Sequence, residues 1–158
     1  MPSSSRIRNV FEPLENSVVA ELWNSRFGIP TQAFDGFRFF RKSHSVWVIS
    51  NSHIPKLSYE TLGMRIMNLK DRPWKPTTCA LQIFGRSATK NLIHLDEVGA
   101  KIFLTGGSQP ILSLSEPGYV VVFYRGDVLG CGLYSHGKLI SQLPKERRME
   151  AKMQGEDI

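Results

Sequence analysis

The sequence predicts an α+β protein in two parts: an N-terminal α+β domain over residues 1–90, and a small β-barrel with one helix over residues 91–148. Three observations lead to this prediction. A helical apolar pattern near the N-terminus precedes an aromatic strand pair, a proline-rich segment interrupts regular structure, and short strands then alternate with Gly-marked turns. With 158 residues, 41% of them apolar, the chain can bury cores of this kind, and residues 149–158 form a polar tail.

The N-terminal part begins with a predicted amphipathic helix over residues 10–28. Gly28 marks the end of this helix, because glycine readily adopts the left-handed conformation found directly after a helix. A short helical turn is expected over 31–34. Residues 37–41 and 45–49 are rich in aromatic and β-branched types, which predicts a hairpin. The apolar face of the first helix is expected to consist of Leu14, Val18, Val19, Leu22 and Trp23.

The middle of the chain is less regular. Residues 62–69 fit a strand and a helix equally well. Residues 72–78 contain two prolines in close succession, which hold the chain extended. Thr77 or Thr78 then caps a helix predicted over residues 79–84.

The loop before this helix is a candidate phosphate-binding element. Because it carries Trp74 and Lys75, it would bring a stacking face and a cation next to the backbone amides of a helix start. The alternative is an ordinary connector whose Trp74 packs in the core. The sequence leaves both interpretations open.

Beyond residue 90, the pattern predicts short strands around one helix. Asp96 caps this helix, Gly106 and Gly107 end it, and a turn at residues 125–127 joins a hairpin. The inner face of the helix is expected to carry Val98, Ile102 and Phe103. Strands are expected at residues 92–95, 111–112, 119–124, 128–134 and 139–143.

Positive charge is concentrated in the middle third of the chain. The whole sequence has a formal net charge of +6. Residues 1–36 and 91–158 each sum to −1, whereas residues 37–90 hold ten basic and two acidic side chains, which sum to +8. This imbalance predicts a surface that binds a polyanion, although a basic face that meets only solvent has the same composition.

Residues 95–107 resemble the opening of a PUA domain, a module named for pseudouridine synthases and archaeosine transglycosylases. They read as an acidic-capped helix followed by a Gly-rich loop, and the small-residue pattern of the following hairpin lies at 118–122 and 129–133. The resemblance covers most of residues 91–148. It implies a PUA-like pseudobarrel that binds RNA.

The segments around this module resemble a narrower group, the C-terminal region of Sun-type rRNA cytosine methyltransferases. There a pre-PUA segment and a PUA-like module follow the catalytic domain, and small free-standing archaeal PUA proteins share the layout. The similarity lies in residues 26–30, 34–40, 75–77 and 142–145. The sequence lacks the Gly-rich nucleotide loop and the Pro-Cys nucleophile segment of the methyltransferases. The resemblance therefore implies RNA binding without catalysis.

Charge and resemblance together select the candidate RNA-binding residues. The resemblance implies that the PUA helix, its Gly-rich loop and a neighbouring strand face the RNA, with Gly106 and Gly107 offering backbone amides. We expect the cations to gather on one surface and to contact phosphates. The candidate residues are Lys75, Arg86, Lys90, Lys101, Thr105, Gly106, Gly107, Lys145, Arg147 and Arg148.

Five aromatic residues are interleaved with the cations of the middle third. Any that are exposed would stack unpaired bases, although at least three of the five are expected in the core. They are Phe37, Phe39, Phe40, Trp47 and Trp74.

Other chemistries find little support in the sequence. The four histidines are scattered, and Cys79 and Cys131 lie far apart, so neither a metal site nor another cofactor is expected. There is no phosphate loop and no nucleophile signature. Since the sequence shows neither a secretion signal nor an apolar run of membrane-spanning length, we expect a cytoplasmic protein without a membrane partner.

The sequence therefore predicts non-catalytic binding of structured RNA, rRNA or tRNA, in RNA modification or ribosome assembly. One alternative is an adaptor whose aromatic hairpin docks on an enzyme partner such as an RNA methyltransferase, or on a ribosome-assembly protein. The other is a subunit of an RNA-modifying enzyme, or an enzyme in its own right, which requires a concave pocket with perturbed titratable groups.

Overall fold

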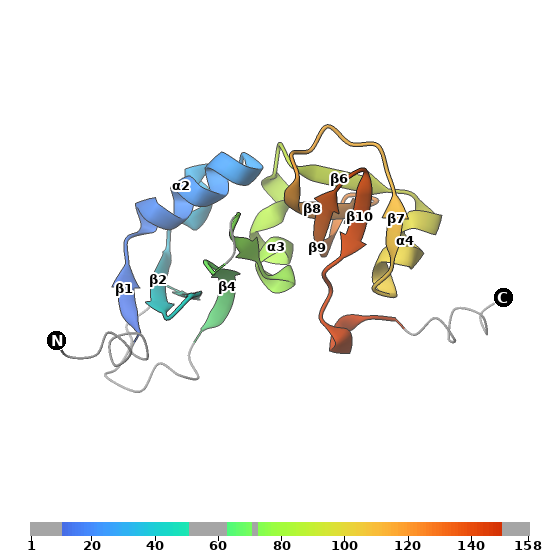
Figure 1. Cartoon of the computed structure of the whole chain (residues 1–158). Coiled ribbons are helices and arrows are strands. Elements are labelled where there is room, and N and C mark those ends of the chain that lie inside the picture. The colour runs from blue at the N-terminus through green and yellow to red at the C-terminus, as the bar shows by residue number, and fades with distance from the viewer. Residues whose placement is uncertain (1–10, 51–62, 71–72, 150–158) are drawn as a thin grey trace.

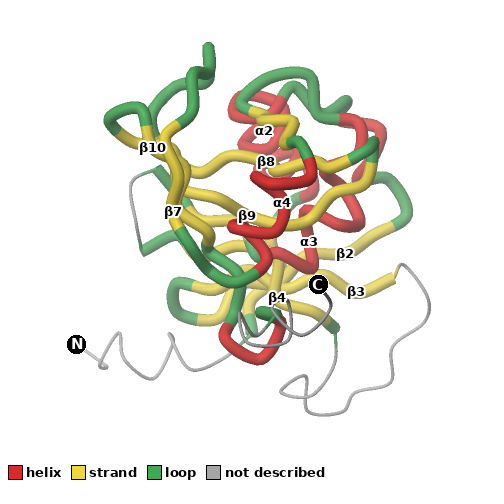
Figure 2. The backbone as a smooth tube through the Cα atoms, turned by 90° about the vertical axis from the view of Figure 1, so that its right-hand side faces the viewer, coloured by secondary structure: helices red, strands yellow, loops and turns green. Residues whose placement is uncertain are grey.

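The computed structural model describes residues 11–50, 63–70 and 73–149, which form two five-stranded sheets and three α-helices. The N-terminal sheet lies on the left of Figure 1 and the C-terminal sheet on the right, with helix α3 (Thr78–Phe84) between them. Figure 2 looks onto the C-terminal part, where helix α4 (Glu97–Leu104) lies in front of the sheet. The predicted α+β class is confirmed.

The N-terminal sheet is antiparallel, with its strands in sequence order. The hairpin predicted from aromatic and β-branched residues is present, and the described part of the ambiguous segment 62–69 is a strand. Lys75 and Pro76 form a two-residue strand at the sheet edge, where proline's missing N–H disrupts the ladder least. The strands are β1 (Glu12–Leu14), β2 (Phe37–Lys42), β3 (Ser45–Ser50), β4 (Met64–Asn68) and β5 (Lys75–Pro76).

The first helix, α2 (Asn16–Phe27), is shorter than predicted because Glu12–Leu14 pairs with β2 as a strand. Gly28 ends the helix with φ of 67°, as predicted. Val18 was expected on the buried face and is exposed instead. The buried side chains of the helix are Val19, Ala20, Trp23 and Phe27, and the 3-10 turn η1 (Thr31–Phe34) follows.

The C-terminal sheet has strand order β6-β8-β9-β10-β7 and fits a PUA-like pseudobarrel. Its β6–β8 pair is parallel and the other pairs are antiparallel. Asp96 caps α4 as predicted, since its carboxylate accepts a hydrogen bond from the Gly99 N–H at 2.7 Å. The strands are β6 (Leu92–Leu95), β7 (Ser108–Pro110), β8 (Gly118–Tyr124), β9 (Asp127–Ser135) and β10 (Lys138–Ser141).

Two predictions about this part are wrong. The strand expected at 111–112 lies at β7 instead, and Leu112 is fully exposed. Val98 was expected on the inner face of α4 but is 68% exposed. The helix turns Gly99 and Ala100 inward, because small residues let it approach β7: a Cβ at position 99 would lie 2.9 Å from the Gln109 side chain.

Strand β8 is buried on both faces, which explains its unbroken apolar sequence. Val121 and Phe123 pack into a core shared with α2 and α3, whereas Val120 and Val122 pack into a second core beneath α4. The N-terminal core thus continues beyond residue 90. The division into residues 1–90 and 91–148 stays a prediction.

Candidate nucleic-acid interface

Lys75 lies where the two sheets meet. Its Nζ donates a hydrogen bond to Gln142 Oε1 at 3.0 Å and lies 5.5 Å from the centre of the Tyr119 ring. Gln142 follows β10 and Tyr119 belongs to β8, so residues of the C-terminal part hold a cation of the N-terminal part. Neither residue carries a charge, so these contacts orient the ammonium group without neutralising it.

Arg26 fixes the backbone beneath this contact. Its guanidinium donates from Nε and Nη2 to the Tyr119 carbonyl at 3.1 and 2.8 Å, and an ion pair of 3.4 Å links it to Glu116. Burial lowers the pKa of Arg26 below its ordinary value, and the Glu116 carboxylate opposes that effect. Arg26 therefore has a structural role, which its isolated position in the sequence did not reveal.

Arg147 reaches the same region from the C-terminal segment. It belongs to the 3-10 turn η3 (Lys145–Arg147) and donates to Gln82 Oε1 at 2.8 Å. Its second contact is Cys79 Sγ, 3.0 Å away, and both partners are exposed residues of α3. As at Lys75, the partners in these contacts are uncharged.

Arg148 packs on the Gly-rich loop that follows α4. Its Nε donates to the Leu143 carbonyl at 2.8 Å. A Cβ at Gly106 would lie 2.7 Å from the Arg148 side chain, so only glycine leaves room for this arginine without displacing it. The next residue, Met149, donates its N–H to the Leu104 carbonyl at 2.7 Å. The loop therefore positions Arg148.

Arg65 in β4 completes the group, although it was not among the residues predicted from the sequence. It is exposed and lines a cavity of about 210 Å³ together with Lys75 and Gln142. Because residues 62–69 fitted a helix and a strand equally well, the side on which Arg65 lies was not predictable. We call the set Arg65, Lys75, Gln142, Arg147 and Arg148 the junction face.

Two candidate cations lie beside carboxylates instead. Arg86 Nη2 is 3.6 Å from Asp127 Oδ1, and Lys101 Nζ is 3.9 Å from Glu97 Oε1, four residues earlier on α4. Both pairs are exposed, so each contributes little to stability. Direct contacts thus join Lys75 with the C-terminal segment. The expected gathering of Lys75, Arg86, Lys90 and Lys101 on one surface stays a prediction.

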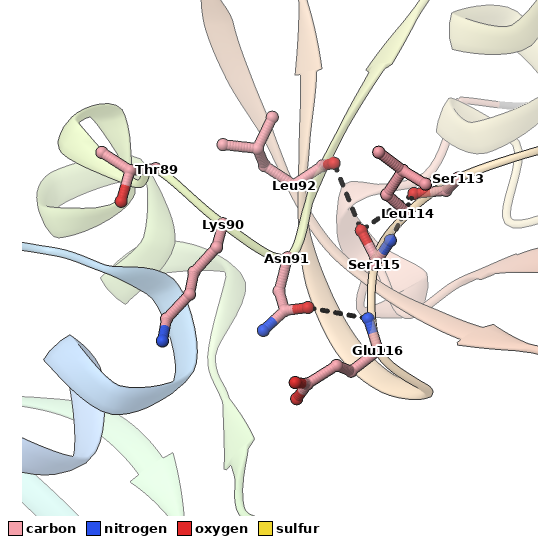
Figure 3. A pocket seen from close by; sticks show the side chains of 8 residues that line it. All are labelled: Thr89, Lys90, Asn91, Leu92, Ser113, Leu114, Ser115 and Glu116. Atoms are coloured by element: carbon pink, nitrogen blue, oxygen red, sulfur yellow. Dashed lines mark hydrogen bonds between the residues drawn. The ribbon is translucent and has the colours of Figure 1, made fainter.

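Lys90 borders a different cavity, of about 320 Å³, lined by residues 89–92 and 113–116 (Figure 3). In this view Asn91 lies between Lys90 and Glu116, and its Oδ1 accepts the Glu116 N–H at 2.8 Å. The Ser113 and Ser115 hydroxyls bond to each other at 2.9 Å. Since its polar groups bond to each other and it contains a carboxylate, this larger cavity is a poor site for an anion.

The expectation that Gly106 and Gly107 offer free amides is wrong. Gly106 N–H donates to the Phe103 carbonyl and Gly107 N–H to the Ile102 carbonyl, each at 3.0 Å. Thr105 is engaged in the same way, because its hydroxyl donates to the Ile102 carbonyl at 2.9 Å. The two N–H groups and the hydroxyl thus donate hydrogen bonds to carbonyl oxygens at the end of α4, as residues that follow a helix commonly do.

None of the five interleaved aromatic residues is exposed. Phe39 and Phe40 are buried, and Phe37, Trp47 and Trp74 are half-buried. The Trp74 ring lies 5.0 Å from that of Trp23, between centres, so it packs on the core and is not a free stacking platform. Trp74 therefore packs as the connector interpretation expects, whereas phosphate binding by Lys75 of the same loop stays a prediction. Thr77 caps α3 through a bond from the Ala80 N–H at 3.1 Å.

The two cysteines differ in their surroundings. Cys79 is exposed, whereas burial raises the pKa of the Cys131 thiol to about 12, which keeps it protonated. Among the residues that the structure describes, no group of three His, Cys, Asp or Glu side chains is arranged to bind a metal ion. In the same residues, no helix has the length and apolar character needed to cross a membrane.

The second sheet, with its capped helix and Gly-rich loop, defines a PUA domain in the C-terminal part of the chain. Comparison with protein families supports this assignment: residues 90–149 match the family described as the Methyltransferase RsmF PUA domain. The predicted resemblance to Sun-type methyltransferases is confirmed for this region. None of the curated proteins compared with the chain matches it.

Proposed function

We propose that this protein binds structured RNA, rRNA or tRNA, without catalysing a reaction on it, and that it acts in RNA modification or ribosome assembly. The match to a PUA-domain family supports RNA binding. The observation that carries the proposal is the junction face, which gathers four cations from both parts of the chain. Their described contacts are with neutral groups, so the positive charge remains available to phosphates.

The remaining candidate residues would support RNA binding from around the junction face. Lys145 lies in the same 3-10 turn as Arg147 and extends the junction face. Arg86, Lys90 and Lys101 would contribute attraction at longer range. At Arg86 and Lys101 phosphates would have to compete with the exposed carboxylates beside them. Thr105, Gly106 and Gly107 would act through the position of Arg148.

The dependence of RNA affinity on salt tests this proposal. If the four cations of the junction face each neutralise one phosphate of a single strand, log Kd changes by about 3 per tenfold change in salt concentration. Fluorescence anisotropy with a labelled tRNA at 50–300 mM salt measures this slope. A flat response, or no binding at low salt, would contradict the proposal.

The adaptor alternative is supported by a different surface from the one predicted. The aromatic hairpin does not expose its rings, but Leu112 and Leu114 in the β7–β8 connection are fully exposed. Two exposed leucines in one connection would suit a protein contact, in this case with a methyltransferase or a ribosome-assembly protein. A pull-down with the Leu112→Ser/Leu114→Ser variant as control would test for such a partner.

A further inference from the structure

The cavity in the junction face is built from both parts of the chain. Its volume of about 210 Å³ lies below the roughly 300 Å³ at which pockets for drug-sized ligands begin. A ligand of that size is one nucleotide unit at most. The cavity is lined by Arg65, Asn68, Lys75, Pro76, Thr77, Thr78, Gln142 and Pro144.

The oxygen acceptors of this lining already have partners. Gln142 Oε1 accepts from Lys75 Nζ at 3.0 Å, and Asn68 Oδ1 accepts from the Lys70 N–H at 2.8 Å. The two threonine hydroxyls accept from the N–H groups of Ala80 at 3.1 Å and of Cys131 at 3.2 Å. A ligand that has to donate hydrogen bonds therefore meets few free acceptors here.

Several hydrogen-bond donors in the cavity lining, in contrast, have no acceptor among the described residues. The Arg65 guanidinium makes no hydrogen bond or ion pair with the described residues, and Lys75 commits one of its three N–H bonds to Gln142. The Asn68 side-chain NH₂ group likewise has no acceptor among the described residues. Among the residues that the structure describes, no carboxylate lines the cavity. Two cations and an amide with free N–H groups select an acceptor-rich anion, and they exclude a metal cation, which needs oxygen ligands.

The apolar residues of the cavity lining favour a particular group next to the anion, namely a sugar. Pro76 comes from the N-terminal sheet and Pro144 from the PUA domain, and both line the cavity with apolar pyrrolidine rings. A phosphate bound to Arg65 and Lys75 would bring its own ribose against these rings. Lys75 is oriented in advance by Gln142 and Tyr119, which lowers the entropy that binding costs.

We propose that this cavity is a subsite for one unpaired ribonucleotide, with its phosphate bound by Arg65 and Lys75 and its sugar packed between Pro76 and Pro144. The inference rests on the proposed RNA-binding function. It adds that the RNA must present an unpaired nucleotide where it crosses from the N-terminal sheet to the PUA domain, because a paired nucleotide is held in its stack and cannot enter a cavity.

Nuclear magnetic resonance titration of the ¹⁵N-labelled full chain tests the subsite directly. The probes are uridine 5′-monophosphate, uridine and a 12-nucleotide single-stranded RNA. We expect the monophosphate and the RNA to shift the backbone amides of Arg65, Thr77 and Gln142, and uridine to shift them much less. Shifts confined to other residues would overturn the subsite. So would shifts from the monophosphate that the RNA does not reproduce, because the cavity then binds a free nucleotide.

A matched pair of variants separates the subsite from general RNA binding. Arg65→Gln removes one charge at the cavity, and Arg41→Gln removes one from the opposite face of the same sheet, since Arg41 is in register with Val46 whereas Arg65 is opposite Trp47. Loss of a charged hydrogen bond predicts about tenfold weaker RNA binding for Arg65→Gln alone. Equal affinities of the two variants would overturn the subsite and leave the proposed function intact. A wild-type chain that binds no RNA would instead overturn the proposed function.

Discussion

The cations of the junction face differ from Arg86 and Lys101 in the groups that hold them. Lys75, Arg147 and Arg148 are held by an amide, an aromatic ring, a thiol and carbonyl groups. Arg86 and Lys101 are held by the carboxylates of Asp127 and Glu97. A neutral partner orients a cation and leaves its charge, whereas a carboxylate cancels the charge at short range.

This difference shows why the charge count alone selects a different set of residues from the junction face. The middle third of the sequence has an excess of +8 and includes Arg86 and Lys90. The junction face takes only Arg65 and Lys75 from that third, and it takes Arg147 and Arg148 from a region whose charges sum to −1. Distance to the nearest carboxylate in space is thus more informative than the local excess of charge in the sequence.

The largest expected effect is the loss of RNA affinity when cations of the junction face, and not Arg86 and Lys101, are replaced by neutral residues. Lys75→Met/Arg147→Met should weaken RNA binding about a hundredfold, because two charge-assisted contacts are lost at about 1.5 kcal/mol each. Arg86→Met/Lys101→Met should weaken it by no more than about threefold, as expected for exposed paired charges. Fluorescence anisotropy at fixed salt measures both.

The two double variants are matched, since each removes two positive charges from a formal net charge of +6. Methionine keeps an unbranched side chain at each position, so packing along the stem is largely retained. Equal losses of affinity would show that RNA responds to the overall field and that the junction face has no special role.

The next effect concerns the support beneath Arg148. Gly106→Ala should destabilise the protein by roughly 1–2 kcal/mol because φ at this position is 87°. It should also weaken RNA binding, since the new Cβ would displace the Arg148 side chain. Thermal unfolding and anisotropy measure the two effects.

Gly137→Ala is the control for this variant. Gly137 has φ of 74°, but a Cβ there would meet nothing within 4 Å. It should cost a similar amount of stability and leave RNA affinity unchanged. If both variants lose RNA affinity to the same extent, general destabilisation explains the loss and Arg148 is not involved.

Much of the fold was predictable because local signals agreed with the tertiary structure. Asp96 and Gly28 mark helix ends through capping chemistry that depends on a few neighbouring residues. The errors arose where tertiary contacts decide. Residues 12–14 are a strand only because β2 lies beside them, and Val98 points outward because Gly99 fits closely against Gln109.

The site was less predictable than the fold. Lys75, Arg147 and Arg148 were identified from charge and family resemblance, but their meeting depends on how α3 packs between the two sheets. Arg65 carried no local signal beyond its charge. The glycines of the loop were predicted to let RNA approach closely, and within the chain the side chain that lies against Gly106 is that of Arg148.

A smaller effect compares two helix caps, one at the cavity of the junction face and one at the start of α4. Thr77→Ala and Asp96→Ala each remove an N-cap and should each cost about 1 kcal/mol of stability. The Thr77 hydroxyl also donates to the Arg65 carbonyl at 2.9 Å, so only Thr77→Ala should lower RNA affinity. If Asp96→Ala lowers RNA affinity equally, the start of α4 is part of the RNA surface, and the junction face is only one portion of that surface.

The smallest effect is expected at the most exposed apolar residues. Leu112→Ser/Leu114→Ser should change the free energy of unfolding by less than about 0.5 kcal/mol, because neither side chain is buried. RNA affinity should also be unchanged, since the loop adds no cation to the junction face and serine keeps the net charge. Urea unfolding and anisotropy measure these quantities. A loss of RNA affinity as large as that of the Lys75/Arg147 variant would mean that RNA is bound through apolar contact with this loop. The neutral partners of the junction cations would then serve the stability of the fold alone.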